Sequence, residues 1–281
     1  MEDRHSVDRF PEIIGEAKVL LDEWVDHRHF EEIDSTQSYV EREHPFFNQE
    51  KLTAVSADYQ SAGRGTGERS WHGTKAQSIL VSFFFRFPAH CDNDFVNSNA
   101  PNVTKVLAVA AVTSLQWAIP DHKVGIKWPN DIVGNGSKLG GILARAVPFH
   151  GRLEGIIVGI GINVNTSQEE LDRIHRPVWP AASLRTLGGT ALDVALLRQM
   201  LLANFALELK RFFKGGFGVF RDRVNHLEVL MGTKVWFRAH ESDEFEGVFE
   251  GIQDDGLILL RLESGEVKAF PSGEIIPPPT T

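Results

Sequence analysis

Residues 153–164 read Leu-Glu-Gly-Ile-Ile-Val-Gly-Ile-Gly-Ile-Asn-Val, a run made mostly of apolar side chains. Its length and its β-branched residues predict a buried strand. Side chains along a strand alternate between its two faces, so Gly159 and Gly161 fall on the same face. Glycine weakens a strand, and a ligand pressed against that face is one good reason to keep two of them. We therefore expect a strand that offers one smooth face to a bound molecule.

Other strands and helices are predicted on both sides of this run. Four short β-rich stretches precede it, at residues 53–57, 79–87, 124–128 and 139–147. Apolar residues spaced three and four apart predict three helices, at residues 8–27, 101–119 and 193–214. This mixture predicts an α+β fold.

After Asn225 the sequence changes to short strand-like segments separated by turn sequences. Strand-like segments follow at residues 234–239, 245–252, 257–262 and 267–270, with turn sequences at 254–256 and 263–265. Four or five strands in about 50 residues predict a small β-barrel, too small for an enzyme by itself but suited to cap one. The expected division is an N-terminal helical extension at 1–27, a main domain at 28–228, and the barrel with its tail at 229–281.

Composition excludes several classes of protein. The 281 residues are 42% hydrophobic and 24% charged, with a net charge of -9, which is typical of a folded globular protein and not of a general nucleic-acid binder. The single cysteine, Cys91, excludes an internal disulfide and a thiolate zinc site. Residues 1–10 resemble neither a signal peptide nor a transit peptide, and the longest apolar run, 79–87, is far too short to span a membrane. We expect a cytoplasmic protein.

The most unusual segment is residues 59–71, Tyr-Gln-Ser-Ala-Gly-Arg-Gly-Thr-Gly-Glu-Arg-Ser-Trp, which follows a predicted strand. Glycines let backbone amides approach a ligand closely, and arginine supplies a permanent charge with a planar donor fork. An anion-binding loop and a surface hairpin both stay open as interpretations. A hairpin explains the glycines, but it does not explain two arginines and Trp71. The segment is neither a Walker A loop nor a dinucleotide-binding fingerprint, because the required lysine and glycine positions are absent.

Two further segments place charged side chains at the ends of predicted strands. Residues 127–131, Lys-Trp-Pro-Asn-Asp, bring a cation, an amide and a carboxylate together, although a β-turn that satisfies its own backbone is the simpler interpretation. Residues 137–143, Ser-Lys-Leu-Gly-Gly-Ile-Leu, place Lys138 at the mouth of an apolar strand. A lone lysine there would be a solvated charge at the edge of a sheet.

Taken together and in this order, the four segments resemble the catalytic core of biotin protein ligases. That family has a Gly-Arg-Gly loop ending in Trp, then Lys-Trp-Pro-Asn-Asp, then Lys-Leu-x-Gly-Ile, then Gly-x-Gly-Ile-Asn. Upstream, residues 34–37, Asp-Ser-Thr-Gln, are similar to the family's Ser-Thr-Asn segment, and downstream residues 273–275, Gly-Glu-Ile, are similar to the end of its barrel. The resemblance covers residues 28–276. It implies a mixed-sheet domain of the biotin/lipoate ligase type followed by an SH3-like β-barrel.

The resemblance also implies a two-step reaction. Biotin and ATP, with Mg²⁺, form biotinyl-5'-adenylate and pyrophosphate, and a lysine of a biotin carboxyl carrier protein domain then attacks the adenylate. Polar side chains for the ureido ring and glycines that leave room for the aliphatic chain form the implied biotin site: Ser35, Thr36, Gln37, Gln60, Gly63, Arg64, Gly65, Lys138, Gly141, Gly159 and Gly161. The implied ATP site comprises Arg69, Trp71, Lys127, Trp128, Asn130, Asp131, Asn163 and Trp179.

Two anions meet in the first step, the biotin carboxylate and the α-phosphate, so positive charge is required beside them. The implied catalytic residues are Lys138 and Arg64 for this step, with Asp131 to orient the attacking amine or accept its proton in the second. No side-chain cluster predicts a metal site, and Mg²⁺ is expected to enter with ATP near Asp131. Trp179 either stacks on adenine or anchors a hydrophobic loop.

The chain departs from the family pattern in two places. The best-known bacterial members carry consecutive arginines after Gly-Arg-Gly, whereas this chain has Thr66, Gly67 and Glu68, which implies weaker retention of the adenylate. Only 33 residues precede Asp34, too few for the DNA-binding domain of repressor-type members. We therefore expect no DNA and no membrane as partners, and the sequence leaves a homodimer open.

Two other functions are compatible with parts of the pattern. A lipoate or octanoyl ligase shares the core architecture, but its arginine-rich and Ser-Gly-Gly-Gly motifs are absent from this sequence. A noncatalytic biotin-binding or scaffold protein is suggested by Thr66, Gly67 and Glu68 in the loop. Transfer of biotin to an apo-carrier domain separates the ligase from both alternatives.

Overall fold

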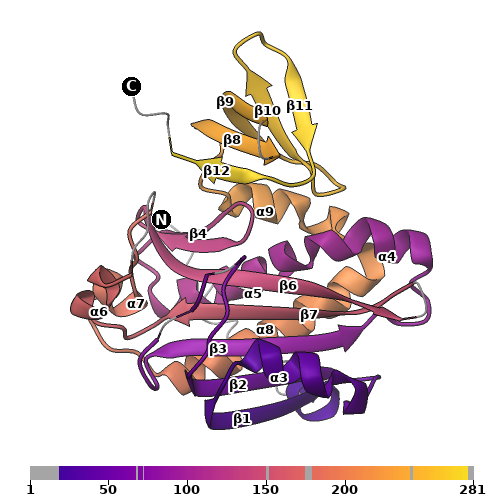
Figure 1. The fold of residues 1–281 in the computed structure, drawn as a ribbon, viewed down its shortest axis with the longest axis vertical. Helices are drawn as coiled ribbons and strands as arrows, with labels where there is room; N and C mark the ends of the chain where they lie inside the picture. The colour runs from indigo at the N-terminus through magenta and orange to yellow at the C-terminus, as the bar shows by residue number, and fades with distance from the viewer. Residues whose placement is uncertain are drawn as a thin grey trace, which may run out of the picture.

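The computed structural model describes residues 19–67, 69–71, 73–149, 152–174, 179–240 and 243–277. Within them a larger domain is built on a seven-stranded sheet, in the order β1-β2-β3-β7-β6-β5-β4, and a smaller domain stands above it in Figure 1. The strands of the large sheet are β1 (Val25–Ile33), β2 (Leu52–Gln60), β3 (Ser78–Arg86), β4 (Val124–Lys127), β5 (Asp131–Gly134), β6 (Ser137–Phe149) and β7 (Arg152–Asn163). β1 and β2 are parallel, and the other neighbours are antiparallel. The predicted α+β fold with a mixed sheet is confirmed.

Helices cover both faces of this sheet. α5 (Val103–Ala118) and α8 (Val194–Gly215) lie on one face, and the short α3 (Thr36–Glu43) packs on the other (Figure 1). On β3, Phe83 points into the core shared with α5 and α8, whereas its neighbour Phe84 points into the core shared with α3. Burial on both faces explains why this strand is apolar at nearly every position.

Shorter elements connect the layers. They are α4 (Asn93–Asn99), α6 (Gln168–Asp172), α7 (Leu184–Gly188), α9 (Arg221–Leu227) and the 3₁₀ turns η1 (His44–Phe46), η2 (Ala100–Asn102) and η3 (Gly218–Phe220). α7 begins at a capping box, in which the Ser183 hydroxyl accepts a hydrogen bond from Thr186 N and the Thr186 hydroxyl accepts one from Ser183 N. Among the described helices, none is long and apolar enough to cross a membrane.

The smaller domain is antiparallel. Its strands are β8 (Lys234–His240), β9 (Asp243–Ile252), β10 (Ile258–Leu262), β11 (Val267–Phe270) and β12 (Glu274–Ile276), in the order β11-β10-β9-β8-β12. Phe270 on β11 and Phe237 on β8 have ring centroids 4.7 Å apart, although two strands separate them in the sheet. The sheet therefore curls around an aromatic core, as the predicted barrel requires. In the described residues its hydrogen-bonded order leaves β11 and β12 as edges, so the strand pairs do not close a ring.

The N-terminal prediction needs correction. Residues 8–18 of the helix predicted at 8–27 lie outside the described residues, and residues 19–24 are helical, but the chain is a strand from Val25 onward. Pairing with β2 along the whole of β1 outweighs the helical spacing of the local sequence. The predicted boundary between residues 27 and 28 thus cuts through β1. The predicted boundary at 228 and 229 falls between α9 and β8.

Phe83 offers a test of how the sheet packs against α8. It is fully buried, and its ring centroid lies 4.6 Å from that of Phe205. We expect Phe83→Ala to lower the free energy of unfolding by about 3–5 kcal/mol, because a cavity opens between sheet and helix. The matched control is Phe46→Ala, at a side chain that is 81% exposed, which should change it by less than about 0.5 kcal/mol. Urea denaturation measures both, and equal losses would contradict this packing.

Candidate active site

A pocket opens on the α3 side of the large sheet. It collects residues from α3, the end of β2, the loop at 61–71, and strands β3, β6 and β7. Most residues predicted to bind biotin line it: Ser35, Thr36, Gln37, Gln60, Arg64, Gly65, Lys138, Gly141, Gly159 and Gly161. Gly63 is adjacent, since a Cβ there would lie 2.9 Å from Gln60 Nε2. Positions far apart in the sequence meet here because β7 lies between β3 and β6.

One end of the pocket is a hydrogen-bond network. Gln60 Oε1 accepts hydrogen bonds from Thr36 N at 2.7 Å and from Thr36 Oγ1 at 3.0 Å. The hydroxyls of Thr36 and Ser82 are 2.9 Å apart, and Ser82 Oγ donates to Gln37 Oε1 at 3.2 Å. Gln37 is buried, and its Nε2 has no hydrogen-bond partner in the part of the chain that the structure describes. A buried donor without a partner is costly, so this end is suited to a ligand with an acceptor atom.

Glycines form the floor of the pocket. A Cβ at Gly159 would lie 2.6 Å from Gln37 Oε1, and one at Gly161 would lie 2.5 Å from Trp71 Cε2. At both distances the side chain of Gln37 or Trp71 would have to shift, so glycine lets each of them pack directly on the strand. The predicted shared face of Gly159 and Gly161 is confirmed. Trp71, predicted for the ATP site, instead packs on this floor among the residues predicted for biotin.

Residues 63–67 and 69–71 form the two arms of a narrow hairpin. Trp71 N donates to Gly63 O at 2.9 Å, and Gly65 N donates to Arg69 O at 2.8 Å. A Cβ at Gly63 would lie 2.4 Å from Trp71 O, so the crossing of the two arms requires glycine. The hairpin interpretation therefore accounts for these glycines, while the side chains of the hairpin line the pocket.

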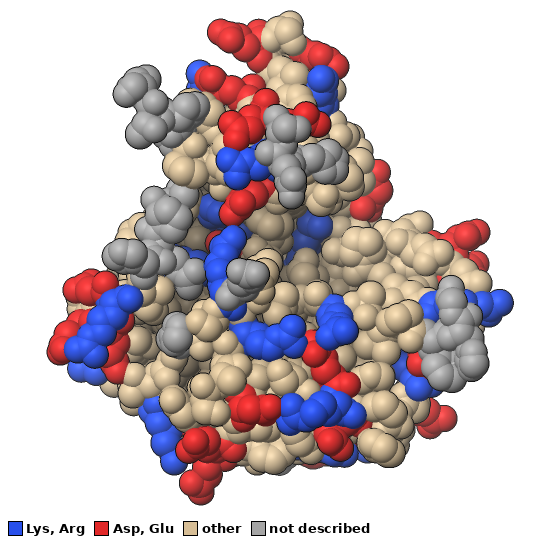
Figure 2. All heavy atoms as spheres, in the orientation of Figure 1, with Lys and Arg blue, Asp and Glu red and all other residues tan. Residues whose placement is uncertain are grey.

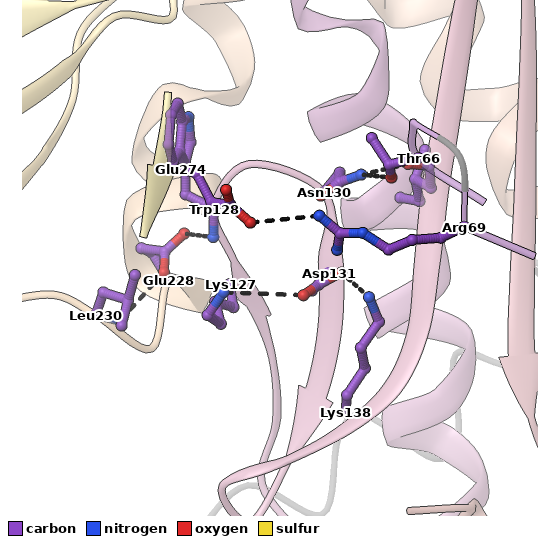
Figure 3. Close-up of polar contacts among 11 residues, drawn as sticks. Thr66, Arg69, Lys127, Trp128, Asn130, Asp131, Lys138, Glu228, Leu230 and Glu274 are labelled. Carbon is purple, nitrogen blue, oxygen red and sulfur yellow. Dashed lines mark hydrogen bonds and ion pairs between the residues drawn. The ribbon is translucent and has the colours of Figure 1, made fainter. Parts of the chain in front are cut away.

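The two arginines of the hairpin reach in different directions. Arg64 Nη1 donates to Glu41 Oε2 on α3 at 2.8 Å. Arg69 Nη2 donates to Glu274 Oε1 on β12 at 3.3 Å, which links the hairpin to the small domain (Figure 3). Glu68, between them, lies outside the described residues. Lys and Arg side chains gather in the middle of this face in Figure 2, although the chain as a whole has a net charge of -9.

Lys127, Asp131 and Lys138 form the charged centre of the site (Figure 3). Lys138 Nζ forms an ion pair with Asp131 Oδ1, and Lys127 Nζ lies 3.8 Å from Asp131 Oδ2. The strands bring them together, because Asp131 pairs with Lys127 on β4 and with Gly141 on β6. Two ammonium groups share one carboxylate, which leaves positive charge for an anionic ligand.

Trp128 and Asn130, both predicted for the ATP site, lie in the turn between β4 and β5 but make different contacts. Asn130 Nδ2 donates to Ile142 O at 2.7 Å and to Thr66 Oγ1 at 3.2 Å, so it ties the turn to the hairpin. The Trp128 ring is 3% exposed and lies against Phe237 of the small domain, with centroids 5.7 Å apart. The Trp128 side chain therefore lies in the interface between the domains, and its place in the ATP site stays a prediction.

A segment at 179–183 passes beside Lys138. Ala182 N donates to Lys138 O at 2.8 Å, and Asn163 Nδ2 donates to Ala182 O at 3.1 Å. Asn163 thus anchors this segment, and its Oδ1 is buried with no partner within the described residues. The ring centroid of Trp179 lies 5.7 Å from Lys127 Nζ. Its partial burial against the core and its place beside a cation are compatible with both predicted roles.

Two parts of the chain match models of known protein families. Residues 29–163 match the model of the biotin/lipoate A/B protein ligase family, and residues 232–276 match that of the biotin protein ligase C-terminal domain. A bifunctional ligase/repressor BirA of Bacillus spizizenii is 30% identical over 244 residues, covering 87% of this chain and 72% of that protein. This chain belongs to the biotin protein ligase family.

Two further relatives agree with the assignment to the biotin protein ligase family. A biotin--[acetyl-CoA-carboxylase] ligase of Mycobacterium tuberculosis is 28% identical over 222 residues, covering 78% of this chain and 77% of that protein. A biotin protein ligase from Aquifex aeolicus, solved in complex with biotin and ATP, has a TM-score of 0.72 and 25% identity and covers 89% of this chain and 97% of that chain. The likeness extends over both domains, which confirms the family resemblance inferred from the motifs.

Two residues of the site, Ser82 and Glu41, were not predicted from the sequence. Ser82 contributes its hydroxyl to the network of Thr36 and Gln37, and the signal for it was a polar residue within the apolar run 79–87. Glu41 binds both Arg64 and Arg145, with N–O distances of 2.8 Å and 2.9 Å. Nothing in the local sequence distinguishes Glu41 from an ordinary acid on a helix surface.

Gly161→Ala tests the contact between the floor and Trp71. The new Cβ would meet three indole atoms at 2.5 Å to 2.8 Å, so we expect the indole to move toward solvent and its fluorescence to shift to longer wavelength. Trp71→Phe identifies the share of this indole in the spectrum. The matched control is Gly73→Ala, whose Cβ would make only ordinary contacts, at 3.4 Å from Ser78 Oγ and 3.8 Å from Trp71 Nε1, and should leave the indole in place. Identical spectra for wild type and Gly161→Ala would show that the indole does not rest on Gly161.

Proposed function

We propose that this chain joins biotin to a lysine of a biotin carboxyl carrier protein domain, by way of biotinyl-5'-adenylate. The observation that carries the proposal is the order of surfaces along the pocket. The polar network touches Gly159 through Gln37, Gly161 follows on the same strand, and Gly141 pairs with Gly161 across the sheet. A Cβ at Gly141 would then lie 3.4 Å from Lys138 Nζ, so the floor leads from the polar network to the charged centre.

Biotin has matching parts in the same order. Its ureido ring needs donors and acceptors, which Thr36, Gln37 and Ser82 supply at the closed end. Its aliphatic chain runs along the glycine floor toward Gly141, and the indole of Trp71, which rests on Gly161 in this structure, moves aside to admit it. Its carboxylate then points at Lys138. In the family relative from Aquifex aeolicus the solved complex contains biotin and ATP, which supports both substrates for this chain.

In the first step a carboxylate oxygen of biotin attacks the α-phosphorus of ATP, and pyrophosphate leaves with the electron pair of the P–O bond. Lys138 holds the carboxylate, and Lys127 and Arg69 face the phosphates. Preorganised cations around a developing negative charge stabilise such a transition state without further rearrangement. Arg64 is held by Glu41 in this structure and would need to leave that partner to act on the same atoms.

In the second step the nitrogen of a carrier lysine attacks the acyl carbon, and AMP leaves with the electron pair of the C–O bond. The amine must lose a proton from a group whose usual pKa is about 10.4. Both oxygens of Asp131 already face lysines, so orienting the amine is the role that fits this carboxylate better. The same two ion pairs fit poorly with the predicted place of Mg²⁺ beside Asp131, since a metal would displace both ammonium groups.

The assay that tests this function uses the purified chain with biotin, Mg²⁺, ATP and an apo-carrier domain. Pyrophosphate release together with biotin on the carrier lysine is the expected result. Turnover with octanoate in place of biotin would favour a lipoate-type ligase. Binding of biotin without pyrophosphate release would favour a scaffold protein.

Lys138→Ala tests the charged centre. Removing one preorganised charge from a transition state costs about 10²–10³ in rate, and we expect a loss of this size in pyrophosphate release. The control is Lys234→Ala on β8, which removes an exposed ion pair with Glu246 and should leave the rate unchanged. Wild-type turnover in a folded Lys138→Ala protein would remove this residue from the site.

Thr66→Arg tests retention of the adenylate. Thr66 lines the pocket beside Asn130, so an arginine here can reach the phosphate of the intermediate. A charge-assisted hydrogen bond of about 1.5–3 kcal/mol would slow adenylate release roughly tenfold or more. We expect wild type to label albumin added as a bystander, and Thr66→Arg to suppress that labelling while sparing the carrier.

The matched control for Thr66→Arg is Ser264→Arg, which adds the same charge at an exposed turn of the small domain. It should leave bystander labelling unchanged. An adenylate off-rate that is slow in wild type and unaltered in Thr66→Arg would show that another residue already holds the phosphate.

A further inference from the structure

The connection between the two domains runs along β4, the edge strand of the large sheet. Val229 N donates to Ile126 O at 2.9 Å, so the connection adds a hydrogen bond to this edge. Gly125 permits the close approach, because a Cβ there would lie 2.6 Å from Val229 Cγ1 and 2.7 Å from Leu227 O. The connection is therefore held against β4, next to the turn that leads into Asp131 on β5.

Glu228 lies in this connection, with its carboxylate buried behind the turn (Figure 3). Oε2 accepts a hydrogen bond from Trp128 N at 3.0 Å, and Oε1 accepts one from Leu230 N at 3.1 Å. A buried backbone N–H without an acceptor is costly, so each oxygen meets a real need. The Glu228 side chain thus links Trp128, the first residue of the turn between β4 and β5, to Leu230 at the start of the small domain.

Glu228 also lies close enough to Lys127 for their charges to interact. Burial raises the pKa of Glu228 to about 7, while its backbone donors and the nearby ammonium group of Lys127 favour the ionised form. Lys127 is 7% exposed and shares Asp131 with Lys138. Glu228 therefore adds a carboxylate near the Lys127 ammonium group, whose ion pair is with Asp131.

We propose that Glu228 is a positioning residue for ATP, which holds Lys127 and the turn at 127–131 in place from the connection between the domains. It touches neither substrate and acts through Trp128 N and the Lys127 ammonium group. The inference rests on the proposed function and extends the nucleotide half of its site beyond the large domain. It predicts a selective effect on ATP, because Thr36, Gln37 and Ser82, the partners proposed for the ureido ring of biotin, lie on α3 and β3.

Glu228→Gln is the primary test. The amide keeps the size of the side chain but turns an NH₂ group toward one of the two backbone donors and removes the negative charge behind Lys127. We expect the KM for ATP in pyrophosphate release, measured with excess Mg²⁺, to rise about tenfold, which corresponds to the loss of one charge-assisted hydrogen bond. The KM for biotin should change by less than about twofold, because the role proposed for Glu228 does not involve biotin.

Glu208→Gln is the matched control for burial. Glu208 on α8 is as buried as Glu228, at 4% exposure, and its carboxylate is paired with Arg211 and Arg223. It has no contact with the turn, so this variant should melt at a lower temperature than wild type with an unchanged KM for ATP. The comparison separates a positioning role from a general loss of stability.

Gly125→Ala provides a second route to the same answer. The added methyl group pushes the connection away from β4 without altering the carboxylate itself, so the KM for ATP should again rise selectively. This variant carries the test if circular dichroism shows that Glu228→Gln is unfolded. A KM for ATP that is unchanged in a folded variant, or KM values for ATP and biotin that rise together, overturns the proposal. Absence of pyrophosphate release by wild type would instead overturn the proposed function.

Discussion

The pairing of β6 with β7 is the contact on which the rest of the site depends. Gly141 lies opposite Gly161, and a Cβ at the preceding Gly140 would lie 2.6 Å from Gly161 O. Such a close approach admits only one register, because a shift by one residue would turn every side chain of the strand to the opposite face. That register places the glycine floor on the α3 side of the sheet. It also places Lys138, at the start of β6, within reach of Asp131 on β5.

Charge is the second constraint. Lys127 is buried, and removing an ammonium group from water is costly unless a partner is present. Asp131 on β5 supplies that partner at 3.8 Å, and Glu228 in the connection between the domains adds a nearby carboxylate. The arrangement leaves the lysines ordered before a phosphate arrives, so little rearrangement is needed when it does.

The small domain takes part in the site through its attachment. Asn225 Nδ2 donates to Ile252 O at 3.1 Å, and Ile252 N donates back to Asn225 Oδ1 at 2.8 Å, which fixes the curled sheet to the end of α9. Phe237 covers Trp128 at the base of the turn. With the domain held in this way, Glu274 on β12 is carried to Arg69 of the hairpin. The hairpin is therefore supported from both domains.

The sequence by itself determined the long elements and the residue types of the site. α5 and α8 are long enough for their apolar spacing to be unmistakable, and the four motifs carry the glycines, lysines and arginines that a family comparison recognises. Short elements were not predicted from apolar spacing, because the four residues of β5 and the eight of α3 show too little periodicity. Only the tertiary structure decided that Val25 begins a strand, that Trp71 rests on Gly161 and Trp128 on Phe237, and that Glu228 accepts a hydrogen bond from Trp128 N. The physical reason is that each of these depends on a partner distant in the chain, and local spacing contains no information about that partner.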